Sequence, residues 1–400
     1  MIPTVLIAFD LSLAGAGNFF TLDNPTRGEL NNTGFTLAGD VYEDVSGDVR
    51  SVSVRRGRSR ELTAFTAGQA SVVLDNRARL YDPTAGTATS PYGPSILPRK
   101  AIFIEVGGQA LFTGVVEDWD LQFSLDGDAI TTAKSTDGFT LLAGETITPG
   151  TATPEGSGAR VDSILDDVHW PTAKRRIDTG VASLGADVIG DNTTALSYLQ
   201  GIDVSEGGAL FVAKDGSVEF LERTASQGAT VMSFTDDGTG VPFSDISLEF
   251  GTESLFTQVS VEYVGGTAVA TAGTAVTNNY GLTELTVKTL LADSGEADDI
   301  AAFYLFRYSE PQVRIDQLEV RLNGLSAAQQ LQVLDLELGD PVDIVFTPQG
   351  IGDPIERVVV VDQIEHNITP ADHVVRLNFS QTLTGFTLDL DRLDQGRLGF

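Results

Sequence analysis

The chain has 400 residues, of which 42% are hydrophobic, and it contains 42 glycines and no cysteine. This hydrophobic content is sufficient for packed cores and excludes wholesale disorder, and the lack of cysteine excludes disulfides and thiolate metal sites. A formal net charge of −31 argues against nucleic-acid binding, because neutralising phosphates requires a basic face.

The acidic balance has two interpretations between which composition does not choose. The charge keeps the chain soluble or reflects a salt-adapted source, or it forms an acidic surface that repels DNA. An acidic channel wall would let DNA slide without sticking, because like charges raise the energy of close approach.

The N-terminal apolar run, residues 5–9, has no basic flank and is followed by Asp10. It therefore lacks the pattern of a signal peptide, and no segment approaches the ~20 apolar residues of a membrane-spanning helix. We expect a soluble chain, made in a cytoplasm, with no membrane span.

Short strands between turns are predicted from residue 52 to residue 119. Residues 70–74 alternate apolar and polar, which is the period of a half-buried strand. Residues 101–106 and 111–116 are apolar and flank Gly107-Gly108, which predicts a hairpin. With many glycines and short apolar segments, the chain is predicted to be mainly β.

Five arginines lie close together in this acidic chain, at the start of the predicted strands. One interpretation is a solvated face paired with local carboxylates. The other is a contact between subunits, since the arginine fork binds carboxylates bidentately and suits interfaces. A contact with DNA is the least favoured, given the net charge. The residues are Arg50, Arg55, Arg56, Arg58 and Arg60.

The clearest boundary is a Thr/Pro/Gly-rich linker at residues 144–158. It follows an N-terminal β domain, 1–143, and precedes a small α+β insert of two helices and a hairpin, 159–243. A C-terminal β domain with one helix spans 244–382, and a tail, 383–400, ends the chain.

The insert carries the first two predicted helices. Apolar residues in 159–168 recur at i, i+3, i+4 and i+7, which predicts an amphipathic helix that stops before Pro171. A second helix is predicted after the N-cap oxygens of residues 191–193. An Asp-Gly turn at residues 214–216 predicts the hairpin.

In the C-terminal domain, residues 265–273 are rich in Ala, Thr and Gly and predict a mobile loop. A third helix is predicted from Ser294, where acidic residues in the first turn favour a helix N-terminus. In residues 313–322 the alternation changes face, which indicates a strand with a β-bulge.

Two blocks of the chain share a spacing that suggests an internal repeat. The interval from Phe112 to Ala129 equals that from Arg357 to Val374. Independent strands with similar hairpins remain the alternative, because residue identity is low. Two related barrels per chain in a three-fold assembly would present six similar units around one axis. The first block comprises 101–106, 111–118 and 129–135, and the second comprises 341–346, 357–362 and 374–380.

Metal ligands are sparse. His366 and His373 lie on either side of a presumed proline turn and could approach each other, but no third ligand is evident. Asp389, Asp391 and Asp394 could bind Ca²⁺ but lack the glycine turn of a dedicated loop. We expect no metal and no cofactor.

Catalytic motifs are equally weak. No G-x-S-x-G occurs, and the best carboxylate candidates for glycoside hydrolysis are Glu117, Asp118 and Asp120 around Trp119. Acids beside an aromatic residue are also an ordinary strand-edge pattern, so we predict that the chain is not an enzyme.

The tail places apolar residues among acids. It is either a frayed amphipathic end or a short element that docks on a neighbouring protein. The docking residues would be Phe386, Leu388, Leu390 and Phe400.

The order of several motifs resembles minor tail proteins of long-tailed phages (siphoviruses), of the tail-tip or baseplate-hub type. These motifs are R-G-R-x-x-E-L, Y-D-P, S-P-Y, L-P-R and L-F-T-G-V-V-E-D-W in the N-terminal part. A-L-S-Y-L-Q-G-I-D-V-S-E-G-G-A-L-F-V follows in the middle, and L-x-L-G-D-P-V near the end. The match extends roughly from Val49 to Thr382.

The resemblance implies two related β-barrel-like hub domains and a virion protein at the tail tip. It implies a homotrimer that adapts a six-fold tail tube to a three-fold tip, gates the DNA channel and anchors fibres. The implied partners are a distal tail protein ring, the tape-measure protein and tail fibre or other minor tail proteins, with DNA only in passage. The alternative is a peripheral receptor- or carbohydrate-binding minor tail protein.

Overall fold

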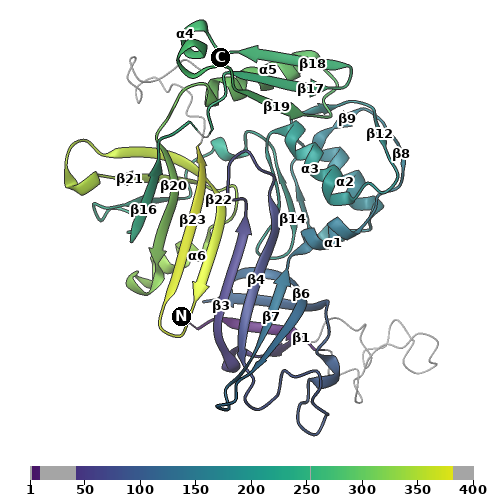
Figure 1. The fold of residues 1–400 in the computed structure, drawn as a ribbon, viewed down its shortest axis with the longest axis vertical. Coiled ribbons are helices and arrows are strands. Elements are labelled where there is room, and N and C mark those ends of the chain that lie inside the picture. The colour runs from purple at the N-terminus through teal and green to yellow at the C-terminus, as the bar shows by residue number, and fades with distance from the viewer. Residues whose placement is uncertain (1, 10–41, 253, 382–400) are drawn as a thin grey trace. The chain divides into compact units, whose positions relative to one another are not determined.

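The computed structural model describes residues 2–9, 42–252 and 254–381 (Figure 1). The chain divides into two compact units, here called unit 1 and unit 2. This division is coarser than the five segments predicted from the sequence, whose boundaries stay predictions. Unit 1 comprises Met1–Val54, Gln69–Asp137 and His366–His373, and unit 2 comprises Arg55–Gly68, Gly138–Glu365 and Val374–Phe400.

Unit 1 is built on a β-sheet with the strand order β3-β4-β7-β6-β5-β1-β2. The strands predicted from alternation are confirmed, and Gly107 and Gly108 turn the β5–β6 hairpin with positive φ angles of 61° and 83°. The strands are β1 Thr4–Ala8, β2 Tyr42–Asp44, β3 Val49–Gly57, β4 Thr66–Asp75, β5 Lys100–Val106, β6 Gln109–Phe123 and β7 Ala129–Thr136.

The core of unit 1 lies on one face of this sheet. Val72 and Leu74 of β4 are fully buried, as are Ile102 and Ile104 of β5, while their sequence neighbours are more exposed. Full burial of such a side chain contributes about 1.5–3 kcal/mol, so the period of two in the sequence selects the buried face.

Unit 2 contains a second run of sheet, in which β16, β20, β23 and β22 lie side by side (Figure 1). β21 pairs with β22, and β15 pairs with β21. Ser247 pairs with Gln317 and Leu248 with Ile315, so Asp316 is the extra residue of the predicted bulge. The strands are β15 Met232–Thr235, β16 Asp245–Glu249, β20 Arg314–Arg321, β21 Pro341–Phe346, β22 Ile355–Ile368 and β23 His373–Gln381.

The α+β part of unit 2 confirms both predicted helices and the hairpin. The N-cap of α3 is Thr194, whose side chain accepts from the Ser197 amide, one residue beyond the predicted 191–193. Residues 144–158 carry β8 and β9, which pair with β12 and β11, and the start of α2. The elements are α1 Gly138–Gly144, β8 Gly150–Ala152, β9 Glu155–Gly156, α2 Ser157–Asp167, β10 Arg175–Ile177, β11 Ser183–Leu184, β12 Asp187–Ile189, α3 Ala195–Glu206, β13 Ala209–Val212 and β14 Val218–Leu221.

A three-stranded sheet, β18-β17-β19, follows, with α5 packed on β17 and β18. The mobile loop predicted for residues 265–273 is wrong, because these residues contain β18, which pairs along its length with β17. The helix predicted from Ser294 is confirmed, with Asp293 as its N-cap. The elements are β17 Gln258–Tyr263, β18 Gly266–Thr271, α4 Thr274–Tyr280, β19 Glu284–Lys288 and α5 Ser294–Tyr308.

Helix α6, Ala327–Asp335, was not predicted. It begins with a capping box, in which the Ser326 side chain accepts from the Gln329 amide and the Gln329 side chain accepts from the Ser326 amide. The S-x-x-Q spacing is the sequence signal that could have identified this helix. Within the described ranges, no helix combines the length and the apolar character needed to cross a membrane.

Candidate functional site

The arginine segment, Arg50 to Arg60, begins in unit 1 with Arg50. Its guanidinium binds Asp128 bidentately at 2.9 and 2.5 Å and also contacts Asp75 at 3.1 Å. Hydrogen bonds from Arg77, and to a lesser degree from Arg50, hold the pKa of Asp75 below its usual range. Arg50 therefore joins two local carboxylates on neighbouring parts of unit 1.

The next arginines belong to unit 2 and also have partners within it. Arg55 donates from Nε and Nη2 to Oε1 of Gln363 at 3.0 and 2.9 Å. Arg56 is buried, and its Nη1 lies 2.5 Å from Oε1 of Glu337. The alternation of β3 places Arg56 on the buried face, where this pairing compensates its charge.

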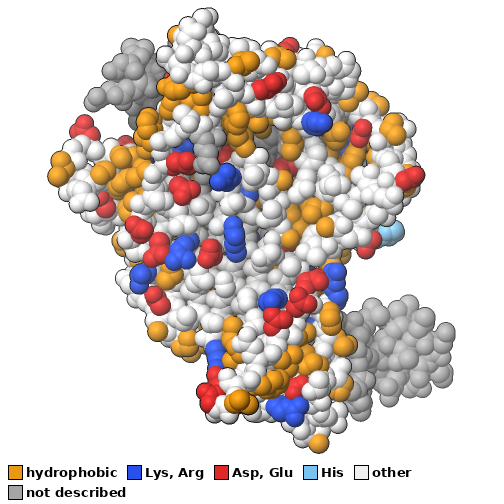
Figure 2. All heavy atoms as spheres, viewed as in Figure 1, with side chains coloured by type: hydrophobic (Ala, Val, Ile, Leu, Met, Phe, Trp, Pro, Cys, Tyr) orange, Lys and Arg blue, Asp and Glu red, His pale blue; other side chains and the backbone are white. Residues whose placement is uncertain are grey.

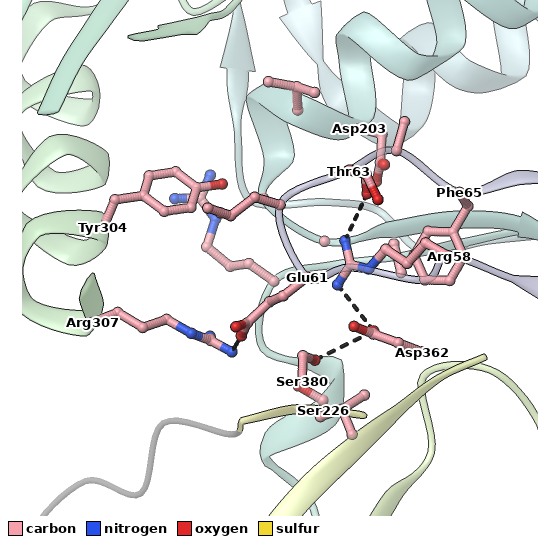
Figure 3. Close-up of a pocket in the computed structure, with 18 of the residues that line it drawn as sticks. Arg58, Glu61, Thr63, Phe65, Asp203, Ser226, Tyr304, Arg307, Asp362 and Ser380 are labelled. Carbon is pink, nitrogen blue, oxygen red and sulfur yellow. Dashed lines mark hydrogen bonds and ion pairs between the residues drawn. The ribbon is translucent and has the colours of Figure 1, made fainter. Parts of the chain in front are cut away.

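Arg58 forms an ion pair with a buried carboxylate. Its Nη2 lies 3.0 Å from Oδ1 of Asp362, and its guanidinium stacks over the Phe65 ring, 4.7 Å from the centroid (Figure 3). Ser380 also donates to Oδ1 of Asp362. Burial raises the pKa of Asp362, and the charge of Arg58 opposes that shift.

These contacts are made inside one chain. Arg50 pairs with carboxylates of unit 1, as the interpretation of a solvated face expects. Arg56 is instead buried, and its partner Glu337 lies 281 positions further along the chain. A contact of the same segment with a neighbouring subunit stays a prediction. On the face drawn in Figure 2, Lys and Arg side chains are scattered, and most lie beside Asp or Glu.

A cavity of about 440 Å³ opens beside Arg58 within unit 2. Its walls come from the loop that follows β3, the C-terminal end of α3, the end of β14, and from β19, α5, β22 and β23. This volume falls in the range of pockets that hold small ligands, about 300–1,000 Å³. Figure 3 shows Arg58, Asp203, Tyr304 and Arg307 around it.

Two charged groups of the cavity wall differ in their environment. Arg307 of α5 binds Glu61, which also receives Nη1 of Arg314 at 3.1 Å. Asp203 of α3 is buried, and its Oδ1 has no hydrogen-bond partner. Burial raises the pKa of Asp203 to about 7, with Arg58 opposing the shift.

Sequence reasoning did not identify Asp203. The signal was present, because Leu199, Ile202, Asp203 and Glu206 follow the i, i+3, i+4, i+7 spacing of the buried side of α3. Acidic residues on the apolar face of a helix are rarely buried without a partner, so this spacing indicates a candidate functional carboxylate.

The carboxylates near Trp119 lie on β6 in unit 1 and make cross-strand pairs. Glu117 is 3.3 Å from Arg99, and Asp120 is 2.5 Å from Lys134. Trp119 donates from Nε1 to the Leu97 carbonyl at 3.0 Å and stacks on Phe9. This is the strand-edge arrangement that the sequence left open beside glycoside hydrolysis.

The predicted approach of the two histidines is confirmed. Nδ1 of His366 lies 3.1 Å from Nε2 of His373, and both rings are buried. Burial lowers the pKa of His373 to about 4. Within residues 2–9, 42–252 and 254–381, no group of three His, Asp or Glu side chains could hold a metal ion.

The remaining candidates fall in the tail and lie outside the described residues. They are the docking residues Phe386, Leu388, Leu390 and Phe400 and the acids Asp389, Asp391 and Asp394.

Solved structures with this fold include phage tail proteins. The 43 kDa tail protein of prophage MuSo2 from Shewanella oneidensis is 13% identical, with a TM-score of 0.58 over 86% of this chain and 95% of that chain. A tail protein from Neisseria meningitidis is 12% identical, with a TM-score of 0.57 over 86% and 94%. The Francisella PdpA-VgrG complex matches 95% of this chain and 52% of that chain, at 8% identity and a TM-score of 0.50.

No family model matches the sequence, and no curated protein matches it. The likeness is therefore one of architecture, and it extends over nearly the whole length of the two tail proteins. The chain is mainly β, has more than one compact unit, and shares the fold of phage tail proteins.

Proposed function

We propose that this protein is a structural component of a phage tail tip, of the baseplate-hub type. The observation that carries the proposal is the shared fold, which covers 86% of this chain and 95% of a prophage tail protein. The order of motifs along the sequence supports the same assignment independently of the fold.

The finer proposal is a homotrimeric ring that adapts a six-fold tube to a three-fold tip, gates the DNA channel and anchors fibres. The proposed repeat corresponds to two blocks of three successive strands, β5–β6–β7 and β21–β22–β23. Three chains would then present six such blocks around one axis. The net charge of −31 suits a passage through which DNA moves without binding.

The proposed partners are a distal tail protein ring, the tape-measure protein and tail fibre or other minor tail proteins. The proposed location is the virion tail tip, after synthesis in the host cytoplasm. A structural role of this kind requires no catalysis, so the proposal includes no enzymatic activity.

Light scattering of the purified chain at several concentrations, combined with electron-microscopic class averages, tests the ring. A trimeric mass with three-fold class averages is the expected result. A chain that stays monomeric at every concentration and binds cell-wall glycan would instead identify a peripheral carbohydrate-binding tail protein.

A further inference from the structure

One buried carboxylate in the cavity of unit 2 lacks a counter-ion. Asp203 is 6% exposed, its Oδ1 is fully buried without a hydrogen-bond partner, and the described residues form no ion pair with it. An unpaired buried carboxylate is unfavourable, because the protein replaces none of the hydrogen bonds that water would supply.

The basic side chains of the cavity wall are all engaged elsewhere. Each forms an ion pair with a different acid, so none is left to neutralise Asp203 directly. The pairs are Arg58 with Asp362, Arg223 with Glu206 and Glu296, Lys288 with Glu262, and Arg307 with Glu61. The charge of Arg58 acts on Asp203 without forming an ion pair with it, so a cation that entered the cavity would meet a carboxylate with no ion-pair partner among the described residues.

The surroundings of Asp203 suit a slender cation. Tyr304 of α5 points its hydroxyl into the cavity (Figure 3), where it can accept a hydrogen bond. Leu62, Phe65 and Leu221 contribute apolar wall, along which an alkyl stem can lie.

We propose that this cavity binds a primary ammonium group on an unbranched alkyl chain, with Asp203 as its counter-ion and Tyr304 beside it. Such a group occurs on free alkyl amines and on lysine side chains of a neighbouring polypeptide. The proposal goes beyond the role in the tail tip and does not depend on it.

Calorimetric titration of the full chain with pentylammonium tests the charge requirement, with pentanol as the neutral analogue of the same length. We expect pentylammonium to bind at least about tenfold more tightly than pentanol. Equal binding of the two, or no binding of pentylammonium at about 10 mM, would overturn the proposal.

Two variants test the residue. Asp203→Asn is expected to weaken pentylammonium binding by about tenfold or more, since a neutral amide cannot pair with the cation. Asp191→Asn, which changes an exposed acid in the loop before α3, is the matched control and should bind as the wild type does. Undiminished binding to Asp203→Asn would refute the assignment.

The affinity of the unmodified chain for pentylammonium, measured as a function of pH, tests the role of Asp203 even where Asp203→Asn fails to fold. The cation binds the ionised carboxylate, so affinity is expected to rise between about pH 6 and about pH 8 as Asp203 loses its proton. A flat profile would contradict the role of Asp203.

The two sources of the ammonium group are separated by a competition between Nα-acetyl-lysine methylamide and cadaverine. Tighter binding of the lysine derivative assigns the site to a lysine of a partner chain, whereas tighter binding of cadaverine assigns it to a free diamine. Both results support the ammonium site, and displacement of pentylammonium by neither compound would overturn it.

Discussion

Arg58 and Asp362 form an ion pair from which water is largely removed on both sides. Their side chains are 16% and 3% exposed, and the two atoms that meet are 3.0 Å apart. Removing one partner of such a pair leaves the other charged and buried, which costs more than the pair itself contributes. Substitution of Arg58 or Asp362 alone should therefore destabilise the fold more than substitution of both together.

We expect Arg58→Met to lower the free energy of unfolding by about 3 kcal/mol, measured by urea denaturation. The double variant Arg58→Met with Asp362→Leu should recover most of that loss, because neither position of the pair then carries a buried charge. Lys288→Met, in a 3.8 Å pair whose lysine is 80% exposed, is the control and should change stability by less than about 0.5 kcal/mol. Equal effects of Arg58→Met and Lys288→Met would contradict this account.

The histidine pair predicts a pH dependence with a definite sign. Burial lowers the pKa of His373 to about 4, whereas an unfolded histidine titrates near about 6.5. Between these values the unfolded chain binds more protons, so His373 contributes stability that grows as pH rises from about 4 to about 6.5. The contribution across that window is about 3 kcal/mol.

His373→Gln should remove this rise in stability, while the glutamine amide is expected still to reach His366. Measurement of the free energy of unfolding between about pH 4 and about pH 6.5 checks the prediction. The exposed His169 serves as the control, since His169→Gln leaves the buried pair intact. Asp203 acts with the opposite sign, because its raised pKa makes the folded chain the better proton binder from about 4 to about 7. The free energy of unfolding of each variant is therefore compared with that of the wild type at each pH. If its slope against pH is the same in His373→Gln as in the wild type, the prediction is refuted.

At the scale of elements, β3 ends beside β22 at a contact that only glycine allows. Gly57 has a φ of +106°, and a Cβ there would overlap the carbonyl oxygen of Asp362. The amide of Arg58 donates to that same carbonyl at 2.9 Å. This close approach also brings the Arg58 side chain to the Asp362 carboxylate.

We expect Gly57→Ala to destabilise the protein by about 3 kcal/mol, because both the φ angle and the space are unfavourable. Gly144→Ala, at the end of α1, meets nothing within 4 Å and is expected to be neutral or slightly stabilising. Thermal unfolding of the two variants side by side is the measurement. A Gly57→Ala variant as stable as Gly144→Ala would show that β3 can move away from β22 without cost.

The capping box of α6 gives a smaller, local prediction. Ser326→Ala removes the oxygen that accepts from the Gln329 amide and should cost about 1 kcal/mol. Ser326→Thr keeps that oxygen and should stay within about 0.5 kcal/mol of the wild type. Faster amide exchange confined to α6 in Ser326→Ala is the expected signature, and unchanged exchange there would argue against the cap.

At the scale of the whole molecule, the net charge opposes the association of chains in the proposed trimer. Each copy carries −31, and Arg50, Arg55, Arg56 and Arg58 are engaged within their own chain. Repulsion between copies is screened as the Debye length falls from ~10 Å at about 0.1 M salt to ~3 Å at about 1 M. Assembly should therefore be favoured by salt.

Light scattering at these two salt concentrations checks this, with a larger oligomeric fraction expected at the higher one. Dissociation at high salt would contradict it and would indicate that ion pairs between subunits, with the arginine segment as the candidate, hold the assembly together.

The sequence by itself determined the local elements in which the pattern of apolar and polar residues follows the pattern of burial. Alternation in residues 70–74 identified β4, and helical spacing in 159–168 identified α2. The change of face in 313–322 indicated a bulge, which the structure places at Asp316. These patterns succeed because burial of one face imposes a period on contiguous residues.

Only the tertiary structure decided which distant residues and strands of the chain contact one another. Residues 266–271 became β18 because β17 offered an edge for them, which their own Ala, Thr and Gly content did not indicate. Arg58 and Asp362 are 304 positions apart, and the cavity beside Asp203 gathers residues from distant segments of unit 2. Such contacts depend on how distant elements pack, and no period in the sequence records that packing.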